Sequence, residues 1–121
     1  MMRRRLALLF PLLALSGAAK DPLAGRTPGK PASCISDALN NSGPTVVDAQ
    51  TILYRQSGRR TWVVHPDGPC PALRPFTTLI VEKWGGQSCS GDRFRVLEPG
   101  ATIASASCRF GKFIPYDKPA R

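Results

Sequence analysis

Arginines alternate with aromatic residues in two stretches of the chain, a combination of residue types that is suited to binding anions. The first stretch, TILYRQSGRRTWVVH, covers 51–65, and the second, DRFRVLE, covers 92–98. A guanidinium group forms paired hydrogen bonds with phosphate or sulfate, while an aromatic ring stacks on flat groups. The candidate polyanion-binding residues are Arg55, Arg59, Arg60, Arg93 and Arg95.

The first stretch predicts a β-hairpin that brings two of these arginines together. β-Branched and aromatic residues fill 51–56 and 59–65, and Ser57-Gly58 separates them. A two-residue turn there places Arg55 opposite Arg60. Like charges in that position repel unless an anion or a carboxylate lies between them, which is the physical argument for a ligand. The pattern leaves open whether all five arginines share one face.

Four cysteines, Cys34, Cys70, Cys89 and Cys108, form the second group with possible chemistry. None belongs to a C-x-x-C pair typical of zinc ribbons or redox sites, and the chain has a single histidine. We therefore expect two disulfides, with no metal and no other cofactor. Of the three possible pairings we prefer Cys70 with Cys89 and Cys34 with Cys108. The first pair brackets one predicted strand, and the second ties the start of the domain to its last strand.

No set of residues predicts an active site. His65 could act as a general base if a carboxylate such as Asp67 oriented it, but no G-x-S-x-G nucleophile motif accompanies it. The carboxylates Asp48, Glu82 and Asp92 belong to no local catalytic motif, and their positions beside turns favour a capping role. We therefore expect no catalytic residues.

Short strands separated by turn residues must position these groups. Besides the hairpin, strands are predicted at 76–84, at 92–98 and, from a weaker pattern, at 109–114. Single helical turns can form at 36–40 and 71–74. Because the chain has 12 prolines, 11 glycines and no helical periodicity, the predicted fold class is mainly β. The expected architecture is a small, disulfide-stapled antiparallel barrel or sandwich of about five strands.

The amino terminus predicts export. Arginines at 3–5 precede an apolar run at 6–15 and small residues at 16–19, the pattern of a signal peptide cleaved near Ala18 or Ala19. The mature protein is then periplasmic or secreted, without a transmembrane segment. The expected organisation is a signal peptide at 1–19, a flexible Pro/Gly leader at 20–33, a single β-rich domain at 34–116 and a polar tail at 117–121.

The charge of the mature chain limits the class of partner. The whole sequence has 17 basic and 8 acidic residues, and removal of the three arginines in the signal peptide leaves 14 basic residues and a net charge of +6. This balance favours acidic partners, such as an acidic envelope component or an acidic protein. Nucleic acid is not the expected partner of an exported protein.

Four segments of the domain resemble a known group of proteins. The segments VVDAQTILYR, GPCPALRPF, CSGDRFRVLE and SCRFGKFIPY, with their ordered cysteines, are similar to an uncharacterised family of short exported proteobacterial proteins. These proteins have four cysteines and form a domain-of-unknown-function family. The resemblance covers 34–116 and implies no activity, substrate or catalytic residue.

These features favour an exported periplasmic binding or envelope-associated module that is non-enzymatic and contacts polyanions. The alternative is a protein-interaction or inhibitor module that presents the loop at 65–75, HPDGPCPALRP, to a partner. Because the module is basic, an acidic partner is favoured over a basic partner. The second alternative is a small hydrolase.

Overall fold

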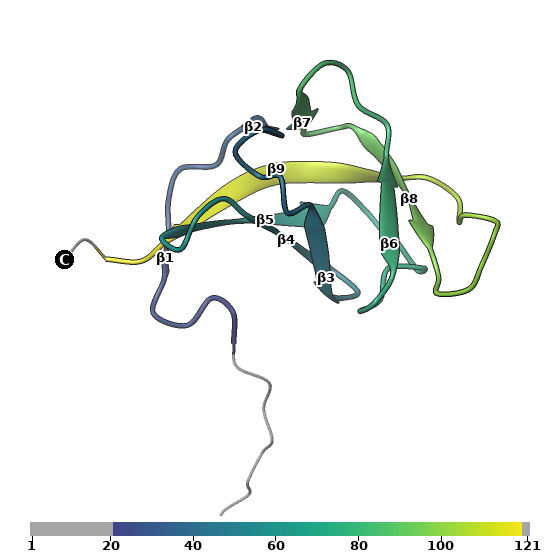
Figure 1. Cartoon of the computed structure of the whole chain (residues 1–121), viewed down its shortest axis with the longest axis horizontal. Coiled ribbons are helices and arrows are strands. Elements are labelled where there is room, and N and C mark those ends of the chain that lie inside the picture. The colour runs from purple at the N-terminus through teal and green to yellow at the C-terminus, as the bar shows by residue number, and fades with distance from the viewer. Residues whose placement is uncertain (1–20, 120–121) are drawn as a thin grey trace, which may run out of the picture.

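The computed structural model describes residues 21–119, and their regular elements are all β-strands (Figure 1). The predicted signal peptide at 1–19 and residues 120–121 of the predicted tail lie outside the described residues. Within 21–119 there is no helix of the length and apolar character needed to cross a membrane. The strands are β1 (Thr27–Pro28), β2 (Cys34–Ser36), β3 (Pro44–Asp48), β4 (Thr51–Arg55), β5 (Arg60–Pro66), β6 (Thr78–Val81), β7 (Gln87–Cys89), β8 (Arg93–Leu97) and β9 (Cys108–Asp117).

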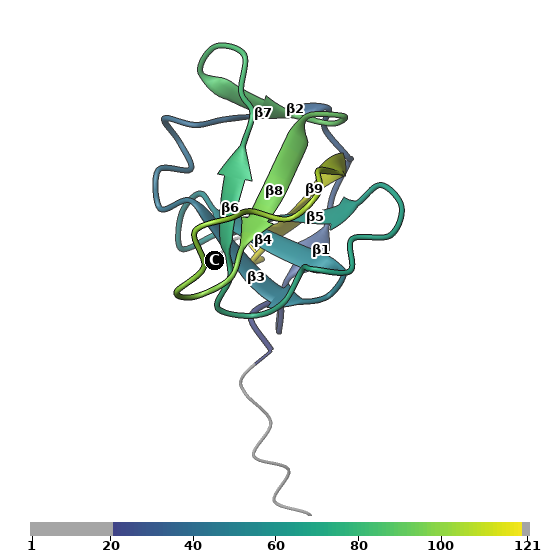
Figure 2. The same cartoon turned by 90° about the vertical axis from the view of Figure 1, so that its right-hand side faces the viewer.

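One antiparallel sheet bends round into a nearly closed barrel. Its strands follow the order β3-β4-β5-β9-β8-β6, and β1 joins the edge of β9. β2 and β7 pair with each other outside this sheet and lie together over one side of it (Figures 1 and 2). The predicted fold class, a mainly β antiparallel barrel or sandwich, is confirmed, and the described chain has nine strands where about five were expected.

β9 connects the two halves of this sheet. Along one edge it pairs with β5, as far as Arg60 opposite Asp117. Along its other edge the first residues pair with β8 and the last with β1. The strand predicted weakly at 109–114 is therefore the longest strand of the described chain and lies in the middle of the sheet.

β9 contains a bulge at Gly111. The ladder slips by one residue between the pairs Val64–Phe113 and Pro66–Phe110, so β9 has one more residue there than β5. The extra residue lets Phe110 and Phe113 both be buried although they are three positions apart. A Cβ atom on Gly111 would lie only 2.8 Å from a backbone oxygen of β5, which explains why glycine occupies the bulge.

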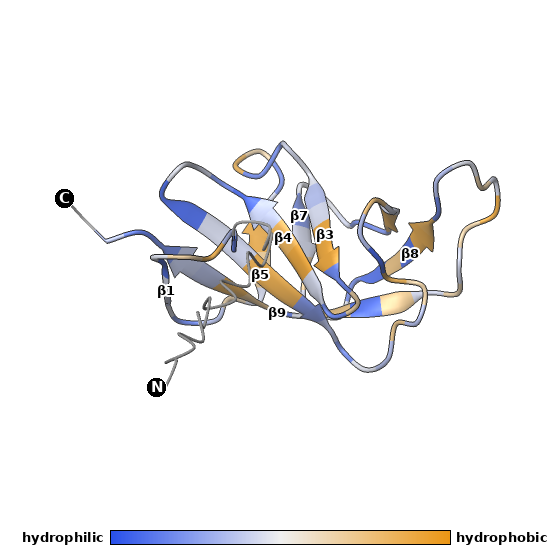
Figure 3. Cartoon of the chain, turned by 90° about the horizontal axis from the view of Figure 1, so that it is seen from below, coloured by the Kyte–Doolittle hydropathy of each residue, from blue (hydrophilic) through white to orange (hydrophobic). Residues whose placement is uncertain are grey.

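The inward faces of the strands pack around three fully buried phenylalanines. Phe94 stacks on Phe110 with ring centroids 4.5 Å apart, and the Phe113 centroid lies 5.6 Å from that of Phe110. Figure 3 shows hydrophobic residues in the middle of β3, β4 and β5, with hydrophilic residues toward the strand ends. Aliphatic side chains complete the core, among them Ile52, Val64, Leu73 and Val96.

Both disulfides form, but the preferred pairing is wrong. The bonds join Cys34 to Cys89 and Cys70 to Cys108. Cys34 and Cys89 face each other across the β2–β7 pair, while Cys108 begins β9 and Cys70 lies in the loop between β5 and β6. The sequence pattern did not reveal the β2–β7 pairing, so it could not place these partners. In the chain-entropy model, loops of 55 and 38 residues each contribute about 4 kcal/mol.

The segment 20–33 is not simply the flexible leader that its composition predicts. Thr27 and Pro28 pair with the end of β9, and the Gly29 amide donates to the carbonyl of Pro115 at 2.7 Å. Ala32 exchanges two backbone hydrogen bonds with Phe113. Proline is tolerated here because the segment lies at a sheet edge, where one N–H is not needed. The folded domain therefore begins before residue 34, and it includes Asp117 of the predicted tail.

The predicted hairpin forms with a longer turn than expected. Arg55 lies opposite Thr61 and not opposite Arg60, so the expected register is wrong by one residue. The amides of Gln56 and Ser57 both donate to the carbonyl of Arg60 at 3.1 Å, which requires more than two residues in the turn. The repulsion that the shorter turn would have created between the two arginines therefore does not arise.

Three smaller expectations also need correction. β3, which proline opens and aspartate ends, was not predicted. β6 occupies only the middle of the predicted strand at 76–84. Residues 36–40 and 71–74 form hydrogen-bonded turns and not helical turns, and in the first the Asn40 side chain donates to the carbonyl of Ser36 at 2.6 Å.

Replacement of the bulge glycine tests whether β9 bends as described. We expect Gly111→Ala to lower the free energy of unfolding by about 2 kcal/mol or more, because the new Cβ must displace the backbone of His65. Gly58→Ala is the matched control, since nothing lies within 4 Å of a Cβ at that position, and its effect should stay within about 0.5 kcal/mol. Urea denaturation measures both. Equal effects of the two substitutions would contradict the bulge.

Candidate functional site

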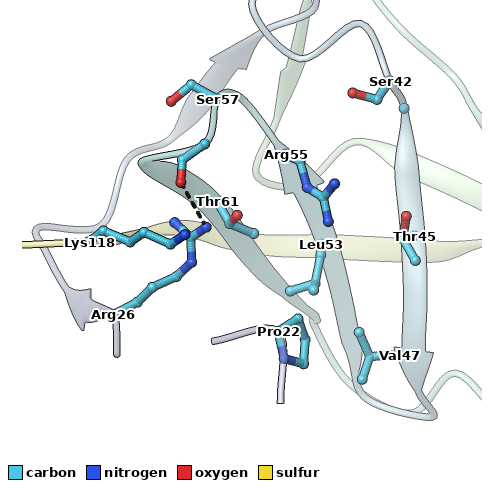
Figure 4. Close-up of a pocket in the computed structure, with 12 residues that line it drawn as sticks. Pro22, Arg26, Ser42, Thr45, Val47, Leu53, Arg55, Ser57, Thr61 and Lys118 are labelled. Carbon is cyan, nitrogen blue, oxygen red and sulfur yellow. Dashed lines mark hydrogen bonds between the residues drawn. The ribbon is translucent and has the colours of Figure 1, made fainter. Parts of the chain in front are cut away.

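A basic cleft of about 470 Å³ lies on the outer face of β3, β4 and β5 (Figure 4). Its walls come from these strands, from the turn of the β4–β5 hairpin, from the segment before β1 and from the residue that follows β9. No aspartate or glutamate is among the described residues that line it. Its charged lining residues are Arg26, Arg55 and Lys118.

The floor of the basic cleft is formed by side chains that are buried although they face away from the barrel core. Leu53 of β4 and Thr61 of β5 are both buried here. Pro22 lies close to Leu53, and Val47 borders the same space from β3 (Figure 4). The segment before β1 thus covers part of an apolar sheet surface and leaves the cleft beside it.

Arg26 is held in place by backbone carbonyl groups. Its Nη1 atom donates to the carbonyls of Arg59 at 2.9 Å and Tyr116 at 3.2 Å, and Nη2 donates to that of Gly58 at 3.2 Å. Its Nε atom is buried and has no hydrogen-bond partner within 21–119. The guanidinium therefore fastens the hairpin turn to the end of β9, and it forms no direct ion pair with a carboxylate of residues 21–119.

Arg60, one of the predicted anion-binding residues, is instead paired with a carboxylate. Its Nε and Nη2 atoms donate to Oδ1 and Oδ2 of Asp117 at 2.8 and 2.7 Å, and its guanidinium lies 5.3 Å from the ring centre of Trp62. Hydrogen bonds from Arg60, and then the charges of Arg60, Arg26 and Arg59, hold the pKa of Asp117 below its usual value. Both carboxylate oxygens of Asp117 are thus already occupied by Arg60.

Arg55 and Lys118 are left without such a partner. Neither side chain has a carboxylate oxygen within 4 Å among the described residues. Figure 4 shows Lys118 beside Arg26 on one side of the basic cleft, with Arg55 reaching in from β4 on the other side. The cleft therefore combines one fixed cation with two exposed cationic side chains.

The structure separates the five predicted arginines into two groups. Arg55, Arg59 and Arg60 lie at the hairpin end, near the last residues of β9, whereas Arg93 and Arg95 lie on β8. Arg93 is opposite Arg109 at the beginning of β9. Asp117 lies eight positions after Arg109 along β9, a distance of about 25 Å. The arginines therefore do not form one face.

The other candidate groups occupy structural positions. The Nδ1 atom of exposed His65 lies 2.6 Å from the carbonyl oxygen of Gln50. Asp48 and Asp92 accept hydrogen bonds from nearby backbone amides at 2.8 Å, as the capping interpretation predicts. Within 21–119 no three or more His, Cys, Asp or Glu side chains gather where they could hold a metal ion.

The loop at 65–75 is not a freely projecting segment. Leu73 is fully buried in the core, and Cys70 is tied to β9 by its disulfide. Together with Ala49 and Gln50 the loop lines a hollow of about 550 Å³, and among the described residues that line it there is no lysine or arginine. These anchors weaken the interpretation of this loop as the binding element of an inhibitor.

Sequence reasoning missed two of the three cations of the basic cleft. Arg26 and Lys118 lie in segments whose proline-rich or polar composition predicts a flexible leader and a tail. The backbone pairing that brings these segments together joins residues about ninety positions apart, and no local pattern signals it. Arg55 was identified because it lies within a strong strand pattern. Comparisons with protein-family models, with curated proteins and with solved structures give no match.

The acid sensitivity of the fold tests the Arg60–Asp117 pair. Because folding lowers the pKa of Asp117, the pair stabilises the protein at pH values above the unfolded pKa of about 4, and this contribution is lost as pH falls through the folded pKa. Asp117→Asn should therefore lower the unfolding free energy near neutral pH, by less than about 1 kcal/mol for so exposed a pair, and should flatten its decline below about pH 5.

Asp67→Asn is the control for this experiment. Asp67 is exposed and its carboxylate has no ion pair or side-chain hydrogen bond within the described chain. Urea titrations at several pH values compare the three proteins. If Asp117→Asn and the parent lose stability in parallel as the solution is acidified, the pair does not hold the end of β9.

Proposed function

We propose that this chain is an exported, non-enzymatic binding module that takes a phosphate- or sulfate-bearing group of an acidic envelope component in the basic cleft. The observation that carries the proposal is the convergence of Arg26, Arg55 and Lys118 on one cleft without a lining carboxylate. Three like charges in a confined space repel each other, and a bound anion removes this repulsion.

The way in which the cations are held supports binding. Arg26 donates to three carbonyl groups, so it keeps its position whether or not an anion is present. Its orientation costs little additional entropy when a ligand arrives. Arg55 and Lys118 have long, exposed side chains that can close over a phosphate or sulfate from opposite walls.

The residues around the basic cleft favour binding over catalysis. Hydroxyl groups of Ser42, Ser57 and Thr45 line it, but neither the single histidine of the chain nor a carboxylate is among the lining residues. A hydroxyl nucleophile needs a neighbouring base to take its proton. The same hydroxyl groups are suitable hydrogen-bond donors to sulfate or phosphate oxygens.

Export is supported by the cysteine chemistry and by the amino-terminal pattern. Two disulfides and no free cysteine within 21–119 are compatible with an oxidising compartment. Cleavage after Ala19 would leave Lys20 as the first residue, two positions before Pro22, which lines the cleft. The new amino group and Lys20 would together contribute two positive charges next to the single negative charge of Asp21.

A small sulfated sugar tests the proposal directly. We expect the mature protein to bind a fully sulfated heparin disaccharide, measured by isothermal titration calorimetry, with an affinity that falls steadily as salt rises from about 20 to about 150 mM. The double variant Arg55→Gln/Lys118→Gln should lose about ten-fold in affinity, because two exposed ionic contacts each contribute up to about 1 kcal/mol.

The control changes the same amount of charge elsewhere. Lys30→Gln/Lys112→Gln removes two exposed cations that do not line the basic cleft, and its affinity should stay within about two-fold of the parent. Equal losses in the two double variants would mean that only net charge matters. Either that result or an absence of binding at low salt would refute the cleft as the site.

A further inference from the structure

The outer edge of β6 carries backbone groups that bond to no other strand. The sheet order ends at β6, which pairs only with β8 in the described chain. The backbone amide of Glu82 donates to the carbonyl of Arg93 on β8. Val96 lies opposite Leu79, but its amide donates to the hydroxyl of Ser105 and its carbonyl accepts from the Ser105 amide, so neither group bonds to β6. Because hydrogen-bonded and non-bonded pairs alternate in an antiparallel ladder, the N–H and C=O groups of Leu79 and Val81 face the outer edge.

The composition of this edge is unusual for a strand that faces solvent. Its four residues are Thr78, Leu79, Ile80 and Val81, with neither a charge nor a proline. Natural proteins usually protect an outer strand with lysine, proline, a bulge or a covering segment, because bare backbone groups recruit other chains. An uncharged edge in which three of the four residues are β-branched is a template for a further strand.

Large hydrophobic side chains accompany the β6 edge at both ends. Of the five that are most exposed within 21–119, three are Phe76 (91 %), Ile80 (45 %) and Trp84 (88 %), which precede, occupy and follow β6. Phe76 also has a φ of 68°, a left-handed conformation that is unfavourable for a bulky residue. Strain of this kind in an exposed ring points to a role other than folding.

A hollow of about 460 Å³ runs beside the same edge. Leu79 and Val81 line it from β6, and Pro44 and Asn40 line it from the opposite side. Asn40 and Tyr54, which also lines the hollow, are buried, and the Oδ1 and hydroxyl oxygen atoms of these residues have no hydrogen-bond partner in the described chain. Burial raises the pKa of Tyr54, so its hydroxyl group stays a neutral donor. The hollow has room and unmet hydrogen-bonding capacity for side chains from an added segment.

Charge beside the edge indicates the chemistry of the partner. Arg95 lies directly opposite Ile80 on the outward face of β8, Arg93 lies two residues away on the same face, and Arg109 is opposite Arg93. Glu82 follows β6, and Asp37, a second carboxylate near this edge, lines the hollow and is paired with Lys83 at 3.3 Å. A segment that pairs with β6 meets a surplus of positive charge. A second copy of this chain would bring the same arginines to the contact.

We infer that the β6 edge binds an extended acidic segment of a partner protein as an added strand, with Phe76 and Trp84 packing against its ends. This mode of recognition uses main-chain hydrogen bonds for affinity and alternate side chains for selectivity. In the added segment, one set of side chains enters the hollow and acidic side chains reach Arg93 and Arg95. The site is separate from the basic cleft and does not depend on the proposed function.

A labelled peptide tests the inference on the whole mature protein. The probe is a synthetic peptide of about nine residues that alternates glutamate and valine, and fluorescence anisotropy measures its binding. A lysine–valine peptide of the same length should not bind. Two further versions carry N-methyl groups on one or the other set of alternate amides. Only the version methylated on the amides that face β6 should lose binding, because an added strand donates from one edge only.

Substitutions assign the binding to the β6 edge. Arg93→Gln/Arg95→Gln should weaken binding of the glutamate–valine peptide about ten-fold, whereas Arg55→Gln/Lys118→Gln should leave it unchanged. Phe76→Gly should weaken peptide binding while raising the thermal midpoint, because glycine adopts the left-handed conformation without strain. A merely structural role for Phe76 would move stability and binding in the same direction.

Four results would overturn the inference. The first is equal binding of both N-methylated peptides, which would exclude strand addition. The second is a dimer by light scattering that Ile80→Lys dissolves, which would assign the edge to self-association. The third is a parent protein that binds phosphatidylglycerol vesicles but not the peptide, together with a Phe76→Gly variant that no longer binds the vesicles. This result would assign Phe76 to contact with a lipid surface. The fourth is an equal loss of peptide binding in Arg93→Gln/Arg95→Gln and in Arg55→Gln/Lys118→Gln.

Discussion

The two-sided pairing of β9 is the constraint on which the rest of the structure depends. One edge of this strand carries β5 along most of its length, while the other carries β8 first and the segment at 27–32 afterwards. The bulge at Gly111 lets β9 pair with both halves of the sheet, because it points the side chains of Phe110 and Phe113 toward the same core. Backbone hydrogen bonds and the aromatic core therefore stabilise the same strand.

This pairing also creates the basic cleft. The end of β9 brings Lys118 to the hairpin turn, and the segment at 27–32 fixes the direction from which Arg26 approaches. Asp117 forms two hydrogen bonds with Arg60, and none of the three cations that line the basic cleft forms an ion pair with a carboxylate of the described chain. The charge of the cleft is thus a consequence of which residues the ladder places together, and not of a run of basic residues in the sequence.

Local patterns predicted the fold class and several elements well. The strand at 92–98 alternates cleanly, so its inward Phe94 and Val96 and outward Arg93 and Arg95 could be assigned from spacing alone. Long-range features could not be predicted in this way. The pairing of Cys34 with Cys89, the edge pairing of Thr27 and the partner of Arg60 each join segments that are more than fifty residues apart. No local period encodes such contacts, and proline in the segment at 20–33 concealed its place in the sheet.

The segment before Cys34 must belong to the folded domain, because Arg26 reaches the basic cleft only if it does. Native-state hydrogen exchange on the mature protein measures this. The amides of Gly29 and Ala32 donate to Pro115 and Phe113, so we expect them to exchange as slowly as the Phe113 amide, which donates back to Ala32. Exchange of Gly29 and Ala32 at the rate of an unstructured peptide, with Phe113 still protected, would contradict the account.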